Sequence, residues 1–174
     1  MTRMFRQLGR QGQPIWQLAQ LNLARPSGPL DAPALADFVA ALAPVNALAD
    51  ASPGFVWRLR TEAGDATGEP GDATGVRWGA DDEVIVNLSV WDSMLALADF
   101  VYGGEHLAVM RRRREWFVPM DRAVTVLWWV PAGHRPTVEE AGERLACLRH
   151  HGPSPHAFTF STAFPAPGEL ATPA

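Results

Sequence analysis

Two segments of the chain, residues 84–91 and 124–130, are apolar at consecutive positions rather than only at alternate ones. Side chains of a β-strand point in turn to the two faces of its sheet, so each segment presents apolar groups on both faces. Both strands therefore need cover on two sides. A sheet that contains them has to be packed between two layers.

The first half of the chain predicts the elements that surround these strands. Residues 15–24 and 55–61 have the composition of strands. Between them, Asp31 is an N-cap and Pro33 lies in the first turn of a helix. The order up to residue 91 is therefore β, α, β, β.

The second half continues the alternation. A helix is expected over residues 92–117, interrupted at Gly103–Gly104, and the strand at 124–130 follows it. Thr137 and Glu140 then form a capping box for a last helix. A short strand is expected at 157–161.

The resulting βαββαβ order is that of an α+β, ferredoxin-like fold, an antiparallel sheet with both helices on one face. The other face is then bare, and the same face of a second copy is the economical cover, which predicts a homodimer. A helix and strand at 137–161 folding over that face is the alternative. The expected organisation is a flexible segment at 1–13, one domain at 14–161 and a disordered tail at 162–174.

Composition excludes several classes of function. The net charge is −4, and all 15 basic residues are arginines, which argues against nucleic-acid binding and against lysine-dependent pyridoxal or phosphate-loop chemistry. Cys147 is the only cysteine, so no disulfide or thiolate-rich zinc site can form within the chain. No signal peptide or membrane span is expected. A cytoplasmic protein without a metal or membrane partner is the prediction.

An imidazole and a guanidinium occur where an amphipathic helix would carry aliphatic groups. His106, Met110, Arg113 and Phe117 follow the spacing of one helical stripe. His106 is the candidate general base and Arg113 its anion-binding partner. A histidine bonded within the core and an arginine reaching outward to solvent remain the alternative.

Two polar rows interrupt the predicted sheet. Gln20 and Asn22 share one face of the first strand, and Asn87 and Ser89 share one face of the third. On the helix-facing side they would be polar anchors in an apolar pocket for a small ligand, with Asn22 and Asn87 as the binding candidates. The alternative is that these side chains bond to one another and only satisfy the core.

Aromatic side chains are abundant enough to stack on a flat ligand, although core packing explains them as well. The remaining ligand-binding candidates are Trp57, Arg58, Trp91, Tyr102, Trp116 and Trp129. No hydrolase, dinucleotide or zinc-protease motif accompanies them.

Several motifs together resemble the family described as domain of unknown function 3291, of the dimeric α/β-barrel superfamily. They are residues 18–22, 53–59, 87–93, 100–102 with His106, 114–117, 127–137, 151–153 and 157–160. The resemblance implies a ferredoxin-like protomer, a sheet-to-sheet dimer and a pocket between helices and sheet. The superfamily includes cofactor-independent monooxygenases of polyketide-like aromatics and haem-degrading enzymes.

Three functions follow as expectations. The first is a dimer that binds an aromatic or polyketide-like molecule and oxygenates or isomerises it without a cofactor, using His106, Arg113, Asn22 and Asn87. The second is haem binding or degradation, because Asn22, Trp91 and His106 resemble the residues of haem-degrading relatives. The third is a binding or structural dimer without catalysis.

Overall fold

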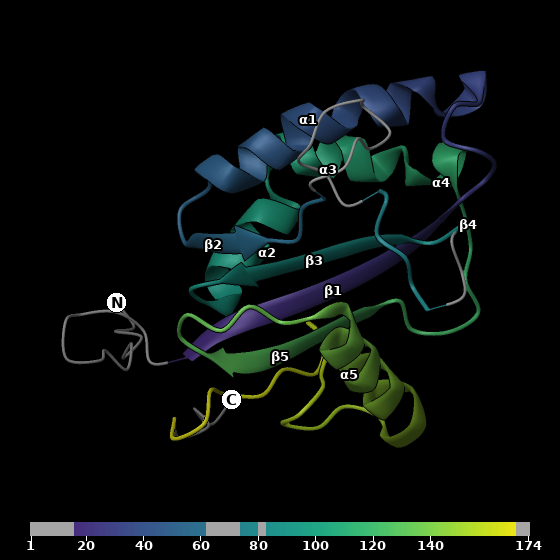
Figure 1. The fold of residues 1–174 in the computed structure, drawn as a ribbon. Coiled ribbons are helices and arrows are strands. Elements are labelled where there is room, and N and C mark those ends of the chain that lie inside the picture. Colours follow the sequence, from purple (N-terminus) through teal and green to yellow (C-terminus); the bar gives the residue numbers. More distant parts are fainter. Residues whose placement is uncertain (1–15, 62–73, 80–82, 170–174) are drawn as a thin grey trace.

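The computed structural model describes residues 16–61, 74–79 and 83–169, and five strands form one antiparallel sheet (Figure 1). The strands are β1 (Trp16–Pro26), β2 (Phe55–Arg58), β3 (Ile85–Trp91), β4 (Phe117–Val118) and β5 (Thr125–Pro131). β1 pairs with β3 on one side and with β5 on the other, and β2 pairs with β3. The short β4 pairs with the last residues of β1. The order β2-β3-β1-β5 confirms the ferredoxin-like prediction.

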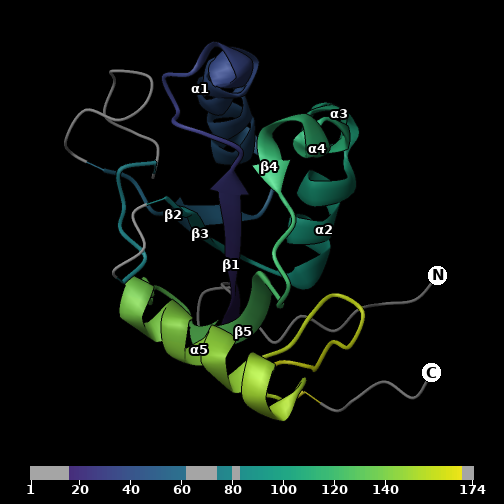
Figure 2. The same ribbon diagram turned by 90° about the vertical axis from the view of Figure 1, so that its right-hand side faces the viewer.

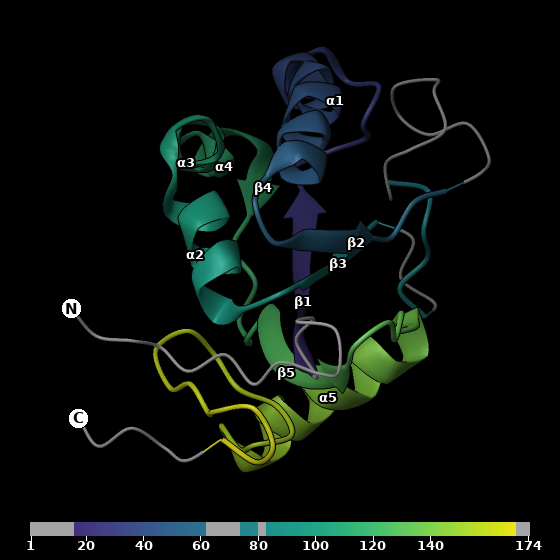
Figure 3. The same ribbon diagram turned by 90° about the vertical axis from the view of Figure 1, so that its left-hand side faces the viewer.

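The helices lie on both sides of this sheet (Figure 2). They are the 3₁₀ turn η1 (Pro33–Leu35), α1 (Ala36–Ala51), α2 (Met94–Tyr102), α3 (Gly104–Arg111), α4 (Arg113–Trp116) and α5 (Val138–His151). α1 to α4 cover one face, as predicted, and α5 lies across the opposite face, as Figure 3 also shows. These faces are called the helix-facing side and the α5 side below.

The α5 side of the sheet is buried within the single chain. Its strand residues are at most 3% exposed: Ala19, Leu21, Leu23, Val86, Leu88, Val90, Val126, Trp128 and Val130. Ala141, Leu145 and Leu148 of α5 pack on them, with Trp57 and Trp78 at the margin. The alternative of an internal cover is therefore the one that the structure adopts.

That cover removes the bare face from which the homodimer was predicted. A second copy would have to dock on another surface, so the sheet-to-sheet contact is a wrong expectation for this arrangement. The homodimer itself stays an untested prediction.

Glu140 holds the start of α5 against β5. The Thr137 hydroxyl accepts the Glu140 N–H at 3.1 Å, as the capping box predicts. The Glu140 carboxylate instead accepts the indole N–H of Trp128 at 3.0 Å and pairs with Nε2 of His134 at 2.7 Å. The acidic residue of the box therefore anchors the helix to the sheet.

The predicted helix over residues 92–117 is three helices. α2 ends before Gly103, where a Cβ would collide with the Asp99 carbonyl oxygen, and Arg112 separates α3 from α4. Phe117 belongs to β4 rather than to a helix.

The C-terminal segment is more ordered than expected and less strand-like. The strand predicted at 157–161 is reduced to isolated bridges, Ser154–Ala157, Leu127–Phe158 and Thr159–Thr162, and in the second of these Leu127 and Phe158 exchange backbone hydrogen bonds of 2.9 Å. Part of the expected tail packs on the domain: the Phe164 carbonyl accepts the Trp129 indole N–H, and Ala166 is buried. Residues 1–15 and 170–174 lie outside the described residues.

One helical segment, Pro33–Ala51, is long and apolar enough to cross a membrane by length and composition alone, with a mean hydropathy of 1.4. No such segment was expected from the sequence. Leu35, Phe38 and Ala49 in it pack on the domain, as in a helix of a globular protein.

The buried contact of α5 is testable by truncating one side chain. Leu145→Ala is expected to lower the free energy of unfolding by about 3 kcal/mol, because it leaves a cavity against the sheet. Glu143→Ala, on the exposed side of the same helix, should change it by less than about 0.5 kcal/mol. Urea unfolding measures both, and equal losses would show that α5 does not pack on the sheet.

Light scattering at micromolar concentration tests whether the internal cover is sufficient. A mass equal to the 18.9 kDa of the chain would show that the internal cover is sufficient and that the homodimer prediction is wrong. Twice that mass would establish the homodimer.

Candidate functional site

A polar band crosses the helix-facing side of the sheet, and strand register aligns its members. The band consists of Gln20, Asn22, Arg58, Asn87, Ser89 and Thr125. Ser89 lies between Gln20 and Arg58 on neighbouring strands. Asn22 lies between Asn87 and Thr125. The two polar rows therefore share the helix-facing side, which is the condition under which the sequence predicts them to act as polar anchors.

Apolar clusters lie at both ends of the band. The aromatic cluster contains Leu18, Trp91, Leu97, Leu127 and Phe158, with Phe55, Phe100 and Trp129 against it. The second cluster contains Leu35, Phe38 and Trp116, with Ile85, Val109 and Phe117 against it. α1 contributes Ala49 to the first and Phe38 to the second, so it spans the band. The arrangement places polar groups between apolar walls, as small-molecule sites do.

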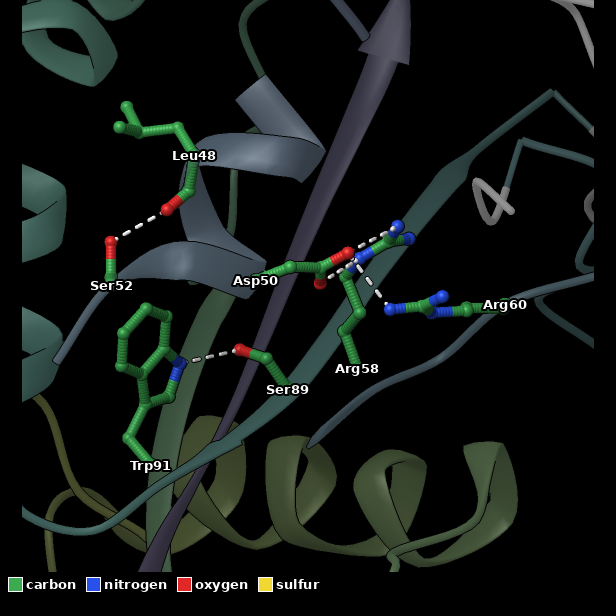
Figure 4. Close-up of polar contacts among 7 residues, drawn as sticks. All are labelled: Leu48, Asp50, Ser52, Arg58, Arg60, Ser89 and Trp91. Carbon is green, nitrogen blue, oxygen red and sulfur yellow. Dashed lines mark hydrogen bonds and ion pairs between the residues drawn. The ribbon is translucent and has the colours of Figure 1, made fainter. Parts of the chain in front are cut away.

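A directional chain of hydrogen bonds runs into the band. The Trp91 indole N–H donates to Ser89 Oγ at 3.0 Å (Figure 4), and the Ser89 hydroxyl donates to Oε1 of Gln20 at 2.9 Å. Ser89 and Gln20 are 5% and 9% exposed. The alternative interpretation of these two residues was that they only satisfy each other's hydrogen bonds in the core. It holds for the side-chain oxygen of Gln20, which accepts the bond from Ser89.

The second polar row is more open. The Thr125 hydroxyl donates to Oδ1 of Asn22 at 2.8 Å, and Asn22 is half-buried. Asn87 is exposed although it lies on an inner strand. Solvent therefore reaches the band at Asn87.

Arg58 is held by a carboxylate at the end of α1 (Figure 4). Its guanidinium donates to both oxygens of Asp50, at 2.9 and 3.3 Å, and Arg60 donates to the same carboxylate at 2.8 Å. The helix dipole disfavours an acidic side chain at a helix C-terminus, and the two arginines offset this. Only 11% of the Arg58 side chain is exposed.

His106 lies at the junction of α2 and α3. Its Nδ1 is 3.0 Å from the Val101 carbonyl oxygen, which can only accept, so Nδ1 carries the proton and Nε2 is the acceptor of the neutral ring. Burial lowers the pKa of His106, against the smaller raising effect of the Val101 carbonyl. A neutral imidazole with an open Nε2 has the properties of a general base.

Two aromatic rings, those of Phe100 and Trp91, lie between the imidazole and the band. The His106 ring centroid lies 4.5 Å from that of Phe100, which stacks on Trp91 at 5.1 Å. The bond to Val101 also provides a donor for a backbone carbonyl at the end of α2. This is a structural role of the kind expected from the sequence as the alternative to a general base.

Arg113 does not share the stripe predicted for it. The stripe assumed one continuous helix, but α3 ends at Arg111 and Arg113 is exposed on α4. Arg112 is the residue of this run that makes contacts. It bonds Asp37 at 2.8 Å and lies 4.8 Å over the Trp116 ring.

The other candidates are dispersed. Trp91 and Trp129 are on the helix-facing side, whereas Trp57 faces the α5 side. Trp116 is buried in the second cluster, and Tyr102 is 59% exposed beside Phe160.

Sequence reasoning weighed a bond between Gln20 and Ser89, but it missed the indole N–H of Trp91 that donates to Ser89 and the pairing of Asp50 with Arg60. The i, i+2 spacing of Ser89 and Trp91, which puts them on one strand face, is the signal that was available.

The residues proposed for haem do not fit a porphyrin in this arrangement. Trp91 is 1% exposed, stacked on Phe100 and met edge-on by Phe55 at 5.3 Å. The ring of His106 packs against the same Phe100. Within the described ranges, no group of three or more His, Cys, Asp or Glu side chains could hold a metal ion.

Comparison with known proteins finds one family. The sequence profile of the domain of unknown function (DUF3291) matches residues 17–173. No curated protein matches the sequence significantly.

Solved structures give distant matches. A protein of unknown function from Nitrosomonas europaea is 14% identical, with a TM-score of 0.41 over 71% of this chain and 95% of that chain. Rv0793 from Mycobacterium tuberculosis is 14% identical, with a TM-score of 0.44 over 70% and 99%. A Chloroflexus aurantiacus protein provisionally described as an antibiotic biosynthesis monooxygenase is 13% identical, with a TM-score of 0.40 over 70% and 98%. These likenesses are too distant to carry function.

The environment of His106 predicts a pH effect on stability. Its pKa is lowered in the folded state, so its contribution is complete above the ordinary value of 6.5 and is lost as the pH falls through the lowered value. Between pH 7.5 and 5 the wild type should lose more stability than His106→Gln, which does not titrate. The exposed His156→Gln should follow the wild type. Parallel curves for all three in thermal unfolding would contradict the buried, neutral imidazole.

Proposed function

The chain belongs to the DUF3291 family, whose name assigns no activity, and we propose from the site itself that it binds a small planar aromatic or polyketide-like molecule over the polar band. The single observation that carries this is the band of amides between two apolar clusters, open to solvent at Asn87. A planar ligand would pack on the apolar walls and bond the amides.

We propose further that bound substrate is oxygenated or isomerised without a cofactor, with His106 as the base. Neutral His106 would take a proton at Nε2 from an activated carbon between two aromatic rings. In oxygenation the resulting carbanion reduces O₂, the CH₂ group becomes a carbonyl, and the second oxygen atom leaves as water. Asn22 and Asn87 would orient the substrate, and Arg58 replaces the exposed Arg113 as the positive group at the band.

Binding without catalysis is the second candidate. The observation that favours it is the Nδ1 bond from His106 to Val101, which gives the imidazole a structural role at a helix junction. We also propose a cytoplasmic location. The single, half-buried Cys147 suits a reducing compartment.

Anthrone tests the catalytic proposal, because it has an activated CH₂ group between two rings. The protein should accelerate its oxidation to anthraquinone with uptake of one O₂ per turnover. His106→Gln should lower kcat about a hundredfold or more, as loss of a general base does. The exposed His156→Gln serves as the control and should keep the activity.

Oxygen consumption and anthraquinone absorbance give the two rates. Anthrone binding without acceleration would select the non-catalytic candidate. Equal activity of His106→Gln and wild type would remove His106 from the mechanism.

A further inference from the structure

Gln20 is a buried amide of which only one half is bonded. Its Oε1 accepts from Ser89, and its Nε2 has no partner among the residues that the structure describes. The residue is 9% exposed. A buried amide nitrogen without an acceptor is costly, so its presence calls for an explanation.

The direction of the bonds fixes which end of Gln20 is free. Ser89 Oγ already accepts the indole N–H of Trp91, so its own proton needs an acceptor. Oε1 of Gln20 provides that acceptor, whereas a flipped amide would offer two more donors instead. The Trp91–Ser89 pair therefore keeps the two N–H donors of Gln20 unpaired.

Asn22 is oriented in the same way. Its Oδ1 accepts from Thr125, and its Nδ2 has no partner within the described part of the chain. Residues two apart on a strand share a face and lie roughly 7 Å from each other. Gln20 and Asn22 therefore each have a bonded side-chain oxygen and an unbonded side-chain nitrogen, one after the other along β1. The band contains no acidic side chain.

We propose that the side-chain nitrogens of Gln20 and Asn22 form a pair of donors that recognises two oxygen acceptors of one planar ligand, carbonyl or enolate oxygens. This rests on the proposed ligand site and names the class of compound that the site takes. Each oxygen would relieve one unsatisfied donor, and a hydrocarbon of the same shape would leave both unpaired. The donors also stabilise negative charge on an oxygen better than on carbon, which suits an enolate.

Gln17 provides a matched control on the same strand. It is also buried, but it points to the α5 side and both ends are bonded: Nε2 donates to Asp92 at 3.2 Å and Oε1 accepts from the Gly133 N–H at 3.0 Å. Gln17→Met should lower the melting temperature and leave ligand affinity unchanged. Gln20→Met should lower the affinity and cost less in melting temperature, because it removes unpaired donors together with one accepted bond.

The experiment compares two probes by calorimetry, anthraquinone-2-sulfonate and anthracene-2-sulfonate, which differ at ring positions 9 and 10, where the quinone has carbonyl groups and anthracene has C–H groups. Wild type should bind the quinone about tenfold more tightly. Gln20→Glu keeps the acceptor for Ser89 and replaces the donor by an oxygen, so it should abolish this preference, as should Gln20→Met. Gln17→Met should retain it.

Equal affinity of the two probes for wild type, or a preference that survives in Gln20→Glu and Gln20→Met, would overturn the donor pair while leaving the ligand site in place. Failure of wild type to bind either probe would contradict the proposed function and this inference with it. Loss of the preference in Gln17→Met together with Gln20→Met would show a general effect of destabilisation and would also overturn it.

Discussion

Hydrogen bonding of β1 to β3 on one side and to β5 on the other fixes the two faces of the molecule. The register pairs Leu21 with Leu88 and Val126 on the α5 side, and Gln20 with Ser89 on the helix-facing side. A slip of one residue would exchange the faces, placing amides under α5 and aliphatic groups in the band. The large apolar area buried under α5 makes that exchange unfavourable, so packing on one face secures the polar groups on the other.

The two faces of the sheet therefore differ in the side chains that they carry. α5 closes one face with apolar contacts, and Gln17 on that face is bonded at both its amide nitrogen and its amide oxygen. On the other face, α1 and α3 lie over a sheet surface whose centre is polar and partly open. An unsatisfied donor such as Nε2 of Gln20 lowers stability, and a protein can carry it because the rest of the sheet is so completely buried.

The sequence predicted what periodicity and topology determine. Alternation along strands was enough to place Gln20 with Asn22, and Asn87 with Ser89, on one face of each strand, whereas the register of β1 with β3 was needed to bring the two pairs to the same side. Alternation did not determine on which face the last helix lies, because a helix that follows the edge strand β5 can turn to either side. The stripe from His106 to Arg113 failed because it assumed an unbroken helix from Gly104 onward, and the break at Arg112 lies between the two residues. The bonds of Ser89 and Gln20 depend on rotamers, which spacing alone does not specify.

The central claim is that the side-chain nitrogens of Gln20 and Asn22 donate hydrogen bonds to oxygen atoms of a bound ligand. Side-chain amide NMR of ¹⁵N-labelled protein titrated with anthraquinone-2-sulfonate tests it most directly, because each NH₂ group is observed separately. The account predicts downfield proton shifts for Gln20 and Asn22 and none for Gln17, whose amide is already bonded on the opposite face. Unchanged Gln20 and Asn22 signals at a saturating probe concentration, or shifts confined to other amides, would contradict it.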